Sequence, residues 1–244
     1  VNYMETDLFY GPFKNKYTES IIVEDIYSDS TFYNYYDRMI SNYREDIDNY
    51  VENIKMFERI LEIGSGSGRT FKPIYDLGFD IYGLEPSLPL VNLLEDKYKN
   101  KILLCKFEEI PYQQISLKFD VFIMTATTIS LFDLHQINEL IDNMKLIGKN
   151  NFKFMFDTIK ETNNKYFELN FNQLENGDKI FYQNFIIGDR FVFNIYSNKY
   201  KKLGYSVKYI HSFKDLYKLF ESKNMKLTTI YTDEKTTMYK AELK

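Results

Sequence analysis

The sequence predicts an α/β fold, a Rossmann-like doubly wound and mostly parallel sheet of about seven strands, with an antiparallel β insertion that caps the active site. Short apolar runs alternate with stretches of helical periodicity between residues 59 and 160, a rhythm typical of βαβ units. From about residue 161, aromatic and polar residues alternate between turn signals, which favours antiparallel strands. One domain carrying an insertion accounts for the 244 residues.

Each element follows from its local pattern. Apolar and aromatic residues at helical spacing predict a helix over 29–55. A short apolar strand at 59–63 leads into a glycine-rich turn, and the helix after that turn ends at Gly78. The later apolar or β-branched runs predict strands at 79–87, 101–107, 118–127, 151–160, 226–233 and 236–244. The intervening helical patterns cover 88–100, 133–150 and 212–225, and two to four antiparallel strands are expected over 165–210.

Composition excludes several classes of function. The formal net charge is −4 and the basic residues are dispersed, which argues against a nucleic-acid partner. A single cysteine, Cys105, allows no internal disulfide, and only two histidines are present, so no protein-built transition-metal site is expected. A carboxylate site for a hard cation is the alternative, and we assign no metal ligand. No apolar run is long enough to span a bilayer, and the first residues lack a signal-peptide pattern. We therefore expect no membrane partner and a cytoplasmic location.

Polar or glycine residues mark the carboxyl ends of the predicted parallel strands. In sheets of this kind, ligands bind beyond those ends. Five such positions converge on one edge of the sheet: Gly64, Glu85, Glu108, Thr125 and Asp157. This edge is the predicted ligand site.

The glycine turn itself, in "RILEIGSGSGRTF" at 59–71, restricts the class of ligand that could bind there. A dinucleotide fingerprint spaces its glycines G-x-G-x-x-G, whereas here they follow one another at every second position. Glycines lack a Cβ, so the backbone can approach a ligand closely. The acid before the turn, Glu62, would repel a pyrophosphate but suits a ligand that carries an ammonium group. Glu85 offers two acceptor oxygens to adjacent hydroxyls.

These stretches resemble the class I S-adenosylmethionine (SAM)-dependent methyltransferases, in particular the small-molecule and natural-product type. "LEIGSGSG" is similar to the family's motif I, "IYGLEPS" to motif II, "LLCKFEEIPY" to the segment near adenine, and "FDVFIMTATTISLF" to motif IV. "NMKLIGKNNFKFMFD" resembles the helix and fifth strand, and "SFKDLYKLFESKNMKLTTIY" resembles the penultimate helix and strand. The resemblance covers roughly residues 30–160 and this C-terminal segment.

The resemblance implies S-adenosyl-L-methionine as cofactor, with S-adenosyl-L-homocysteine (SAH) as product. The implied cofactor-binding residues are Tyr36, Glu62, Gly64, Ser65, Gly66, Gly68, Glu85, Pro86, Phe107, Glu108 and Thr125. Glu62 would receive the ammonium group, Glu85 the ribose hydroxyls, and Tyr36 the carboxylate. Lys106 stands where many members have an acid for the adenine amine, so backbone amides near Phe107 and Glu108 are expected to hold adenine. Arg69 either reaches the cofactor carboxylate or points outward.

Methyl transfer from a sulfonium needs alignment and, for some acceptors, removal of a proton, so no catalytic triad is expected. Two residues are candidates for the acceptor side. Asp157 would orient an amine or cationic acceptor, with a turn role as the alternative. His135, which follows motif IV, would act as a general base, with a structural role at a helix start as the alternative. His211 is a weaker candidate base.

The predicted division is a helical cap at 1–55, a SAM-binding Rossmann-like domain at 56–160 and 205–244, and an antiparallel substrate lid at 161–204. The lid's aromatic residues are Tyr166, Phe171, Phe181, Tyr182, Phe185, Phe191, Phe193 and Tyr196. Such a lining favours transfer to an N or O atom of a small molecule, such as a natural product. The alternatives are N-methylation of the N-terminal amine of a ribosomal or modified peptide, a non-catalytic SAM-binding protein, and a dinucleotide oxidoreductase.

Overall fold

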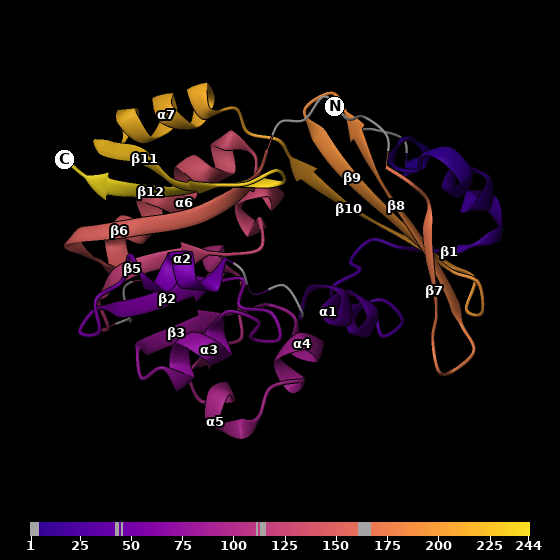
Figure 1. Ribbon diagram of the computed structural model, residues 1–244, viewed down its shortest axis with the longest axis horizontal. Coiled ribbons are helices and arrows are strands. Elements are labelled where there is room, and N and C mark those ends of the chain that lie inside the picture. Colours follow the sequence, from indigo (N-terminus) through magenta and orange to yellow (C-terminus); the bar gives the residue numbers. More distant parts are fainter. Residues whose placement is uncertain (1–4, 42–43, 45, 111, 113–115, 161–166) are drawn as a thin grey trace. The chain divides into compact units, whose positions relative to one another are not determined.

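The computed structural model describes residues 5–41, 44, 46–110, 112, 116–160 and 167–244. The chain forms two compact units, which are labelled by element in Figure 1. The antiparallel unit contains residues 1–36 and 162–210, and the Rossmann unit contains residues 37–161 and 211–244. Contacts thus group residues 37–55 with the Rossmann unit, while the functional division into cap, cofactor domain and lid stays a prediction. Within the described residues, no helix is both long and apolar enough to cross a membrane.

The Rossmann unit is built on a seven-stranded sheet in the order β11-β12-β6-β5-β2-β3-β4. The strands are β2 (Arg59–Ile63), β3 (Asp80–Leu84), β4 (Ile102–Leu103), β5 (Phe119–Met124), β6 (Gly148–Ile159), β11 (Met225–Thr232) and β12 (Thr236–Leu243). The five strands from β4 to β6 are parallel, whereas β12 runs antiparallel to both β6 and β11. The predicted Rossmann-like, mostly parallel sheet is confirmed.

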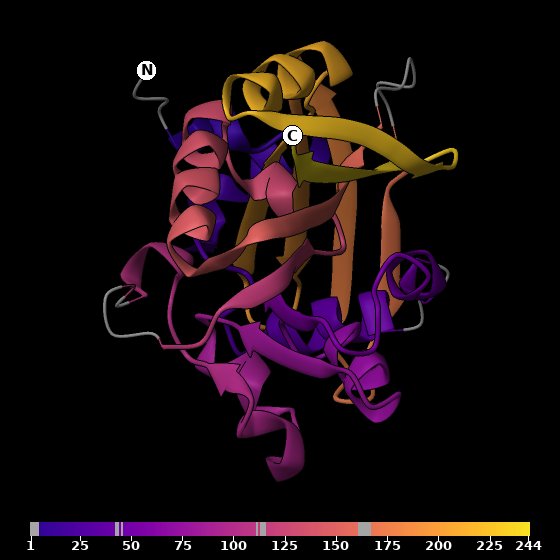
Figure 2. The same cartoon turned by 90° about the vertical axis from the view of Figure 1, so that its left-hand side faces the viewer.

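Helices cover both faces of this sheet, as a doubly wound fold requires. They are α2 (Ile47–Val51), α3 (Phe71–Asp76), α4 (Leu88–Asn92), α5 (Asp96–Lys99), α6 (Leu134–Ile147) and α7 (Phe213–Ser222), with short 3-10 turns η3 (Phe107–Glu109) and η4 (Thr128–Leu131). The longest, α6, starts with reciprocal hydrogen bonds between Asp133 and Gln136, which satisfy two free backbone amides at its N-terminus. It lies along one face of the sheet (Figure 2).

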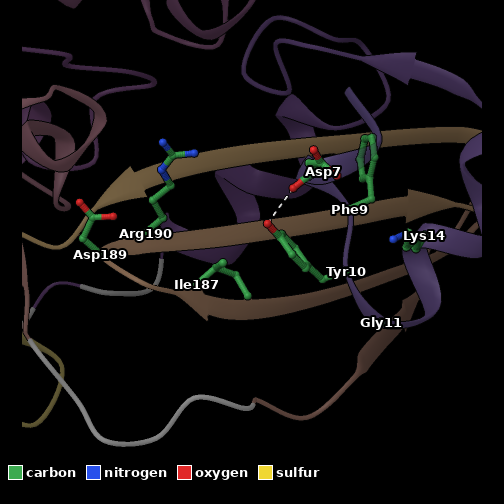
Figure 3. A pocket seen from close by; sticks show the side chains of 8 residues that line it. All are labelled: Asp7, Phe9, Tyr10, Gly11, Lys14, Ile187, Asp189 and Arg190. Carbon is green, nitrogen blue, oxygen red and sulfur yellow. Dashed lines mark hydrogen bonds between the residues drawn. The ribbon is translucent and has the colours of Figure 1, made fainter. Parts of the chain in front are cut away.

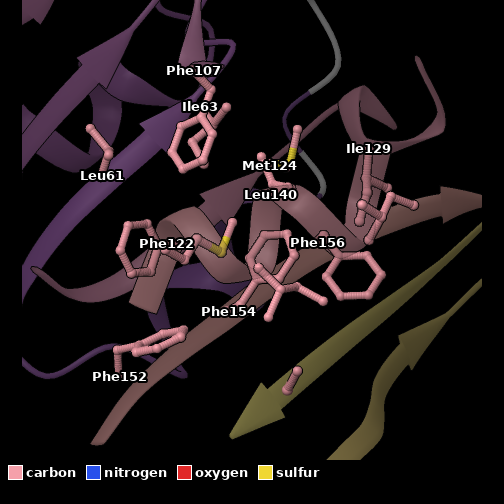
Figure 4. Close-up of a cluster of buried hydrophobic side chains, with 14 of the residues drawn as sticks. Leu61, Ile63, Phe107, Phe122, Met124, Ile129, Leu140, Phe152, Phe154 and Phe156 are labelled. Atoms are coloured by element: carbon pink, nitrogen blue, oxygen red, sulfur yellow. The ribbon is translucent and has the colours of Figure 1, made fainter. Parts of the chain in front are cut away.

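The pleat of the strands sorts their apolar residues between two cores. Leu61 and Phe122 point to the face covered by α6 and α7, where they join Phe154 and Phe156 (Figure 4). Phe220 of α7 belongs to the same cluster. Their neighbours in sequence, such as Ile60 and Val121, point to the opposite face and pack under α2, α3, α4 and α5. Strands with both faces buried read as continuous apolar runs, which is why the sequence predicted them.

The antiparallel unit is a five-stranded sheet in the order β1-β10-β9-β8-β7. Its strands are β1 (Ile21–Val23), β7 (Asn170–Gln173), β8 (Lys179–Ile187), β9 (Arg190–Ser197) and β10 (Lys202–Tyr209). β7 to β10 are antiparallel neighbours, but β1 pairs with β10 in parallel, with Ile21 opposite Lys202. The 3-10 helices η1 (Glu5–Leu8) and η2 (Gly11–Glu19) precede β1, and α1 (Tyr33–Ser41) follows it.

Three predicted elements differ from the structure. The predicted helix over 88–100 is divided into α4 and α5. The predicted helix over 29–55 appears as α1 and α2, and residues 42, 43 and 45 between them lie outside the described residues. The predicted strand at 101–107 is reduced to Ile102–Leu103, because it forms the edge of the sheet. Leu103 and Leu104 are 39% and 50% exposed, so this apolar run does not extend as a buried strand.

Candidate functional site

The glycine turn after β2 adopts a backbone that only glycines take easily. Gly64, Gly66 and Gly68 have φ angles of 76°, 55° and 85°. A Cβ on Gly64 would lie 2.8 Å from Thr128 Cγ2, and one on Gly68 would lie 2.7 Å from Leu94 Cδ2. A Cβ on Gly66 would meet no described atom within 4 Å. Gly64 and Gly68 therefore allow close packing of the turn, whereas Gly66 leaves backbone open to a ligand.

Glu62 is a buried carboxylate just before this turn. Glu62 is 1% exposed, and its Oε1 accepts a hydrogen bond from Thr125 Oγ1 at 3.0 Å. Thr70 Oγ1 lies 3.0 Å from the same threonine hydroxyl. Oε2 is buried and has no hydrogen-bond partner among the described residues. Burial raises the pKa of Glu62 to about 8, because desolvation disfavours the charged form.

Glu85 sits at the carboxyl end of β3, beside the glycine turn. Its Oε2 accepts from Gly66 N at 2.8 Å, and its Oε1 accepts from Ser87 N at 2.8 Å. The turn itself is fastened to the same strand, since Gly64 N and Ser65 N both donate to Leu84 O at 2.8 and 3.1 Å. The structure thus brings together the two acids that the sequence singled out for the turn and the second strand. Pro86, next to Glu85, is exposed.

A buried ion pair joins the turn to α2, and sequence reasoning missed it. Arg69 donates from both terminal nitrogens to the two carboxylate oxygens of Asp46, each at 2.7 Å, and the side chains are 5% and 7% exposed. Ser67 also donates a hydrogen bond to the Asp37 carboxylate. Arg69 therefore does not point outward. No local sequence signal links a residue of the turn to a carboxylate that precedes α2.

Asp157, on β6, is 4% exposed and has protein partners at both oxygens. Tyr50 OH donates to Oδ1 at 2.6 Å, and Thr127 N donates to Oδ2 at 2.7 Å. Burial is the main cause that raises the pKa of Asp157 to about 6, although both hydrogen bonds oppose it. Burial likewise keeps the pKa of the Tyr50 phenol well above its usual value, so Tyr50 remains a donor.

Neither histidine lies among these buried acids. The His135 side chain is 79% exposed on the first turn of α6, and its Nδ1 lies 3.8 Å from Glu139 Oε2. His211 is 8% exposed, and its Nε2 lies 2.9 Å from the Phe132 carbonyl oxygen. A base role for either one stays a prediction that its surroundings do not favour.

The segment assigned to adenine forms η3 after the edge strand β4. Phe107 is 3% exposed and meets Tyr112 edge-on, with ring centroids 5.8 Å apart. Glu108 and Lys106 are exposed. Ser65, another predicted cofactor residue, is 4% exposed, and its hydroxyl is buried without a partner among the described residues. It fills the space against β3, where a Cβ on Gly83 would lie 2.7 Å from Ser65 Oγ.

The remaining predicted residues belong to the antiparallel unit. Tyr36, on α1, packs edge-on against Tyr27 with centroids 4.9 Å apart, and the Tyr27 hydroxyl lies 2.9 Å from Ser206 Oγ. Alternation along the strands divides the predicted lid aromatics between two faces. Phe181, Phe185 and Tyr196 pack with η2, while Tyr182 and Phe193 face α1. Phe171 is 62% exposed, and Tyr166 lies outside the described residues.

A cleft of about 380 Å³ opens in the antiparallel unit, beside the turn between β8 and β9. Its lining, shown in Figure 3, is Asp7, Phe9, Tyr10, Gly11, Lys14, Ile187, Asp189 and Arg190. Tyr10 OH donates to the Asp7 carbonyl oxygen at 2.7 Å. None of the residues predicted from the sequence to bind the cofactor lines this cleft.

Comparison with known proteins agrees with this geometry. Residues 61–151, which contain the glycine turn, Glu85, Thr125 and α6, match the family model of a methyltransferase domain. No curated protein matches the sequence.

Solved structures with low sequence identity share the fold. The sugar N-methyltransferase KedS8 from Streptoalloteichus is 11% identical with a TM-score of 0.70, and the match covers 92% of this chain and 97% of that one. CalS10, a SAM-bound amino pentose methyltransferase from Micromonospora echinaspora, is 10% identical with a TM-score of 0.67, covering 91% and 100%. A SAM-dependent methyltransferase from Clostridium acetobutylicum is 12% identical with a TM-score of 0.67, covering 87% and 98%.

The matched domain and the shared fold agree with each other. The matched domain contains the glycine turn after β2 and the acid that ends β3, and because β2 and β3 are parallel neighbours, both lie at the carboxyl ends of the strands. Residues 61–151 of the chain therefore match a methyltransferase domain, and its fold is the one found in solved S-adenosylmethionine-dependent methyltransferases.

Proposed function

We propose that this methyltransferase transfers a methyl group to a nitrogen atom of a small molecule of the natural-product type, with an oxygen atom as the alternative acceptor. The observation that supports cofactor binding at the glycine turn is the buried Glu62 oxygen that lacks a protein partner. A buried acceptor without a donor is costly, and the ammonium group of an amino-acid moiety would supply three donors. The open backbone at Gly66 supports the same placement.

Each cofactor group has a proposed binding residue. Glu62 and Thr125 receive the ammonium group, and Tyr36 donates to the carboxylate. Glu85, with Pro86 beside it, accepts from the ribose hydroxyls, for which its two backbone hydrogen bonds already fix its orientation. Phe107 and Glu108 hold adenine. The remaining proposed contacts come from the backbone of the turn: Gly64, Ser65, Gly66 and Gly68.

An amine acceptor fits the side chains better than a hydroxyl. Bound S-adenosylmethionine supplies an electrophilic methyl group, so the protein's main tasks are to align the acceptor and exclude water. A neutral amine attacks without a base, whereas an unactivated hydroxyl needs one. His135 is exposed and His211 contacts a backbone carbonyl, so neither histidine is well placed to serve as that base.

One face of the antiparallel unit has the composition of an acceptor surface. Tyr182 and Phe193 are half-buried on the face that packs with α1, and their ring centroids lie 6.0 Å apart. Tyr36 belongs to α1, and its partner Tyr27 reaches Ser206 on β10. Aromatic faces bind both sugar rings and ammonium groups, so an amino sugar or a related amine would suit them. Similarity to a sugar N-methyltransferase and to an amino pentose methyltransferase supports this acceptor class.

The cofactor part of the proposal is tested by calorimetry with S-adenosylhomocysteine. Glu85→Ala removes both ribose acceptors, and we expect the affinity to fall by about 100-fold. Asp80→Ala, at the other end of β3, removes an ion-paired acid of the same strand and serves as the matched control with unchanged affinity. Equal affinity in Glu85→Ala and the unsubstituted protein would overturn the ribose assignment.

The acceptor part is tested by a panel of amino sugars, other small amines and matched hydroxyl compounds, with release of S-adenosylhomocysteine as the readout. We expect turnover with amines and an N-methyl product by mass spectrometry. Turnover confined to hydroxyl compounds would transfer the proposal to oxygen. Turnover only with peptides would replace the small-molecule acceptor altogether.

A further inference from the structure

The loop that follows β5 carries two adjacent residues in a conformation that ordinary side chains avoid. Ala126 and Thr127 have φ angles of 55° and 56°. The left-handed region costs roughly 1–2 kcal/mol per residue for residues other than glycine, and more for a β-branched one such as threonine. Two such residues in succession persist only where the surroundings hold them. Contacts from outside the loop must therefore hold it in this conformation.

The residues on either side of this pair touch the cofactor site. Thr125 donates to Glu62 Oε1, the acid proposed to receive the ammonium group. Thr128 packs against Gly64, since its Cγ2 would lie only 2.8 Å from a Cβ added there. Thr128 Oγ1 also donates to the Thr125 carbonyl oxygen at 2.6 Å, which closes the loop on itself. The left-handed pair thus sets where Thr125 and Thr128 meet the glycine turn.

The hydrogen bonds of Asp157 supply these contacts. Its Oδ2 accepts from Thr127 N at 2.7 Å, the backbone amide of the second left-handed residue. Its Oδ1 accepts from Tyr50 OH at 2.6 Å, and the same hydroxyl oxygen lies 3.2 Å from the Met124 carbonyl oxygen at the end of β5. Tyr50 is fully buried and Asp157 nearly so. Tyr50 on α2 and Asp157 on β6 therefore contact the backbone at the Met124 carbonyl oxygen and at Thr127 N.

We propose that Asp157 and Tyr50 are positioning residues, which hold the loop at 125–128 in its left-handed form so that Thr125 and Glu62 are preset for the cofactor. This inference rests on the proposed cofactor site and assigns to Asp157 a function that does not require contact with the acceptor. The carboxylate acts through the amide of Thr127, and Tyr50 acts through the carboxylate.

The direct test compares Tyr50→Phe with Tyr98→Phe. Both changes remove one hydroxyl that donates to an aspartate from a buried tyrosine, since Tyr98 OH donates to Asp76 Oδ2 at 2.7 Å. Asp76 ends α3 and has no part in the loop. We expect Tyr50→Phe to weaken S-adenosylhomocysteine binding by about tenfold and to speed hydrogen exchange at the Thr127 amide. Tyr98→Phe should change neither.

A rescue experiment separates local positioning from general stability. Asp157→Asn should also weaken binding by about tenfold. Adding Ala126→Gly removes only a methyl group and makes one left-handed position free of strain, so affinity should recover at least threefold even though glycine loosens the unfolded chain. Failure of this rescue, or equal affinities for Tyr50→Phe and Tyr98→Phe, would overturn the inference. Absence of binding by the unsubstituted protein would instead overturn the proposed function. The exchange rate of the Thr127 amide would still test whether Asp157 and Tyr50 hold the loop in place.

Discussion

At the scale of single residues, the proposed site contains one acid, Glu62, whose burial favours its uncharged form until a ligand arrives. Burial raises the pKa of Glu62 to about 8, so most of this side chain is protonated at pH 7 before the cofactor binds. An ammonium group against Oε2 favours the carboxylate and lowers that pKa again. In the folded protein without ligand, the raised pKa means that the stability contributed by Glu62 is present at low pH and is lost as the pH rises through about 8.

Cofactor binding should therefore release a proton. In calorimetry at pH 7, buffers of different ionisation enthalpy should report close to one proton released per S-adenosylhomocysteine bound. Affinity should rise between pH 6 and pH 8, by at most about tenfold per pH unit. Glu62→Gln, which cannot ionise, should bind more weakly and show neither effect. Proton uptake in place of release would contradict the role given to Glu62.

At the scale of elements, the Asp46–Arg69 pair connects α2 to the turn that precedes α3. Both charges are buried, and each guanidinium nitrogen meets one carboxylate oxygen. Removing one partner leaves an uncompensated buried charge, which typically costs 3–5 kcal/mol. Replacing both by apolar side chains removes that penalty. The pair is thus expected to make the two single substitutions strongly non-additive.

Urea denaturation provides the measurement. Arg69→Met and Asp46→Leu should each lower the free energy of unfolding by about 3–5 kcal/mol, and the double variant should lose less than either single one. Lys97→Met breaks a matched but half-exposed pair with Asp76 and should cost less than about 1 kcal/mol. Additive losses in the double variant would mean that the pair is not a coupled unit.

The elements and the turn were predictable because their signals are local. The apolar run at 59–63 and the glycines that follow specify a strand and a turn wherever the rest of the chain lies. The same holds for Glu85, whose place at a strand end follows from the period of the sheet. Asp46, Tyr50 and Asp157 differ, because their functions depend on partners that are distant in sequence. Their pairing is decided by tertiary packing, for which a single sequence carries no pattern.

At the scale of the whole molecule, the chain forms two compact units with separate cores. Clusters around Phe185 and Ile195 belong to the antiparallel unit, and those around Phe154 and Ile60 belong to the Rossmann unit. The sequence predicted the change of architecture after residue 160, but not that residues 1–36 supply a strand to the antiparallel sheet. β1 is only three residues long and partly exposed, so its pattern resembles a loop.

Separate cores predict that the two units respond differently to the cofactor. Scanning calorimetry should resolve two transitions, and S-adenosylhomocysteine at 100 times its dissociation constant should stabilise the Rossmann unit by about 2.7 kcal/mol. Glu85→Ala at the same ligand concentration should largely abolish the shift. If the ligand shifted only the transition of the antiparallel unit, the proposal that the cofactor binds to the Rossmann unit would be wrong.

The pairing of Ile21 with Lys202 has a consequence for biosynthesis. A ribosome makes the first strand of the antiparallel sheet long before the strand beside which it must lie. At translation rates of about 5–20 residues per second, the N-terminal arm waits roughly ten to forty seconds for its partner. During that interval, the ribosome makes the Rossmann unit as far as β6. The antiparallel sheet is therefore completed only after β6 has been made, although before β11 and β12 complete the Rossmann sheet, and until then its unpaired edge is a surface on which the nascent chain needs protection from aggregation.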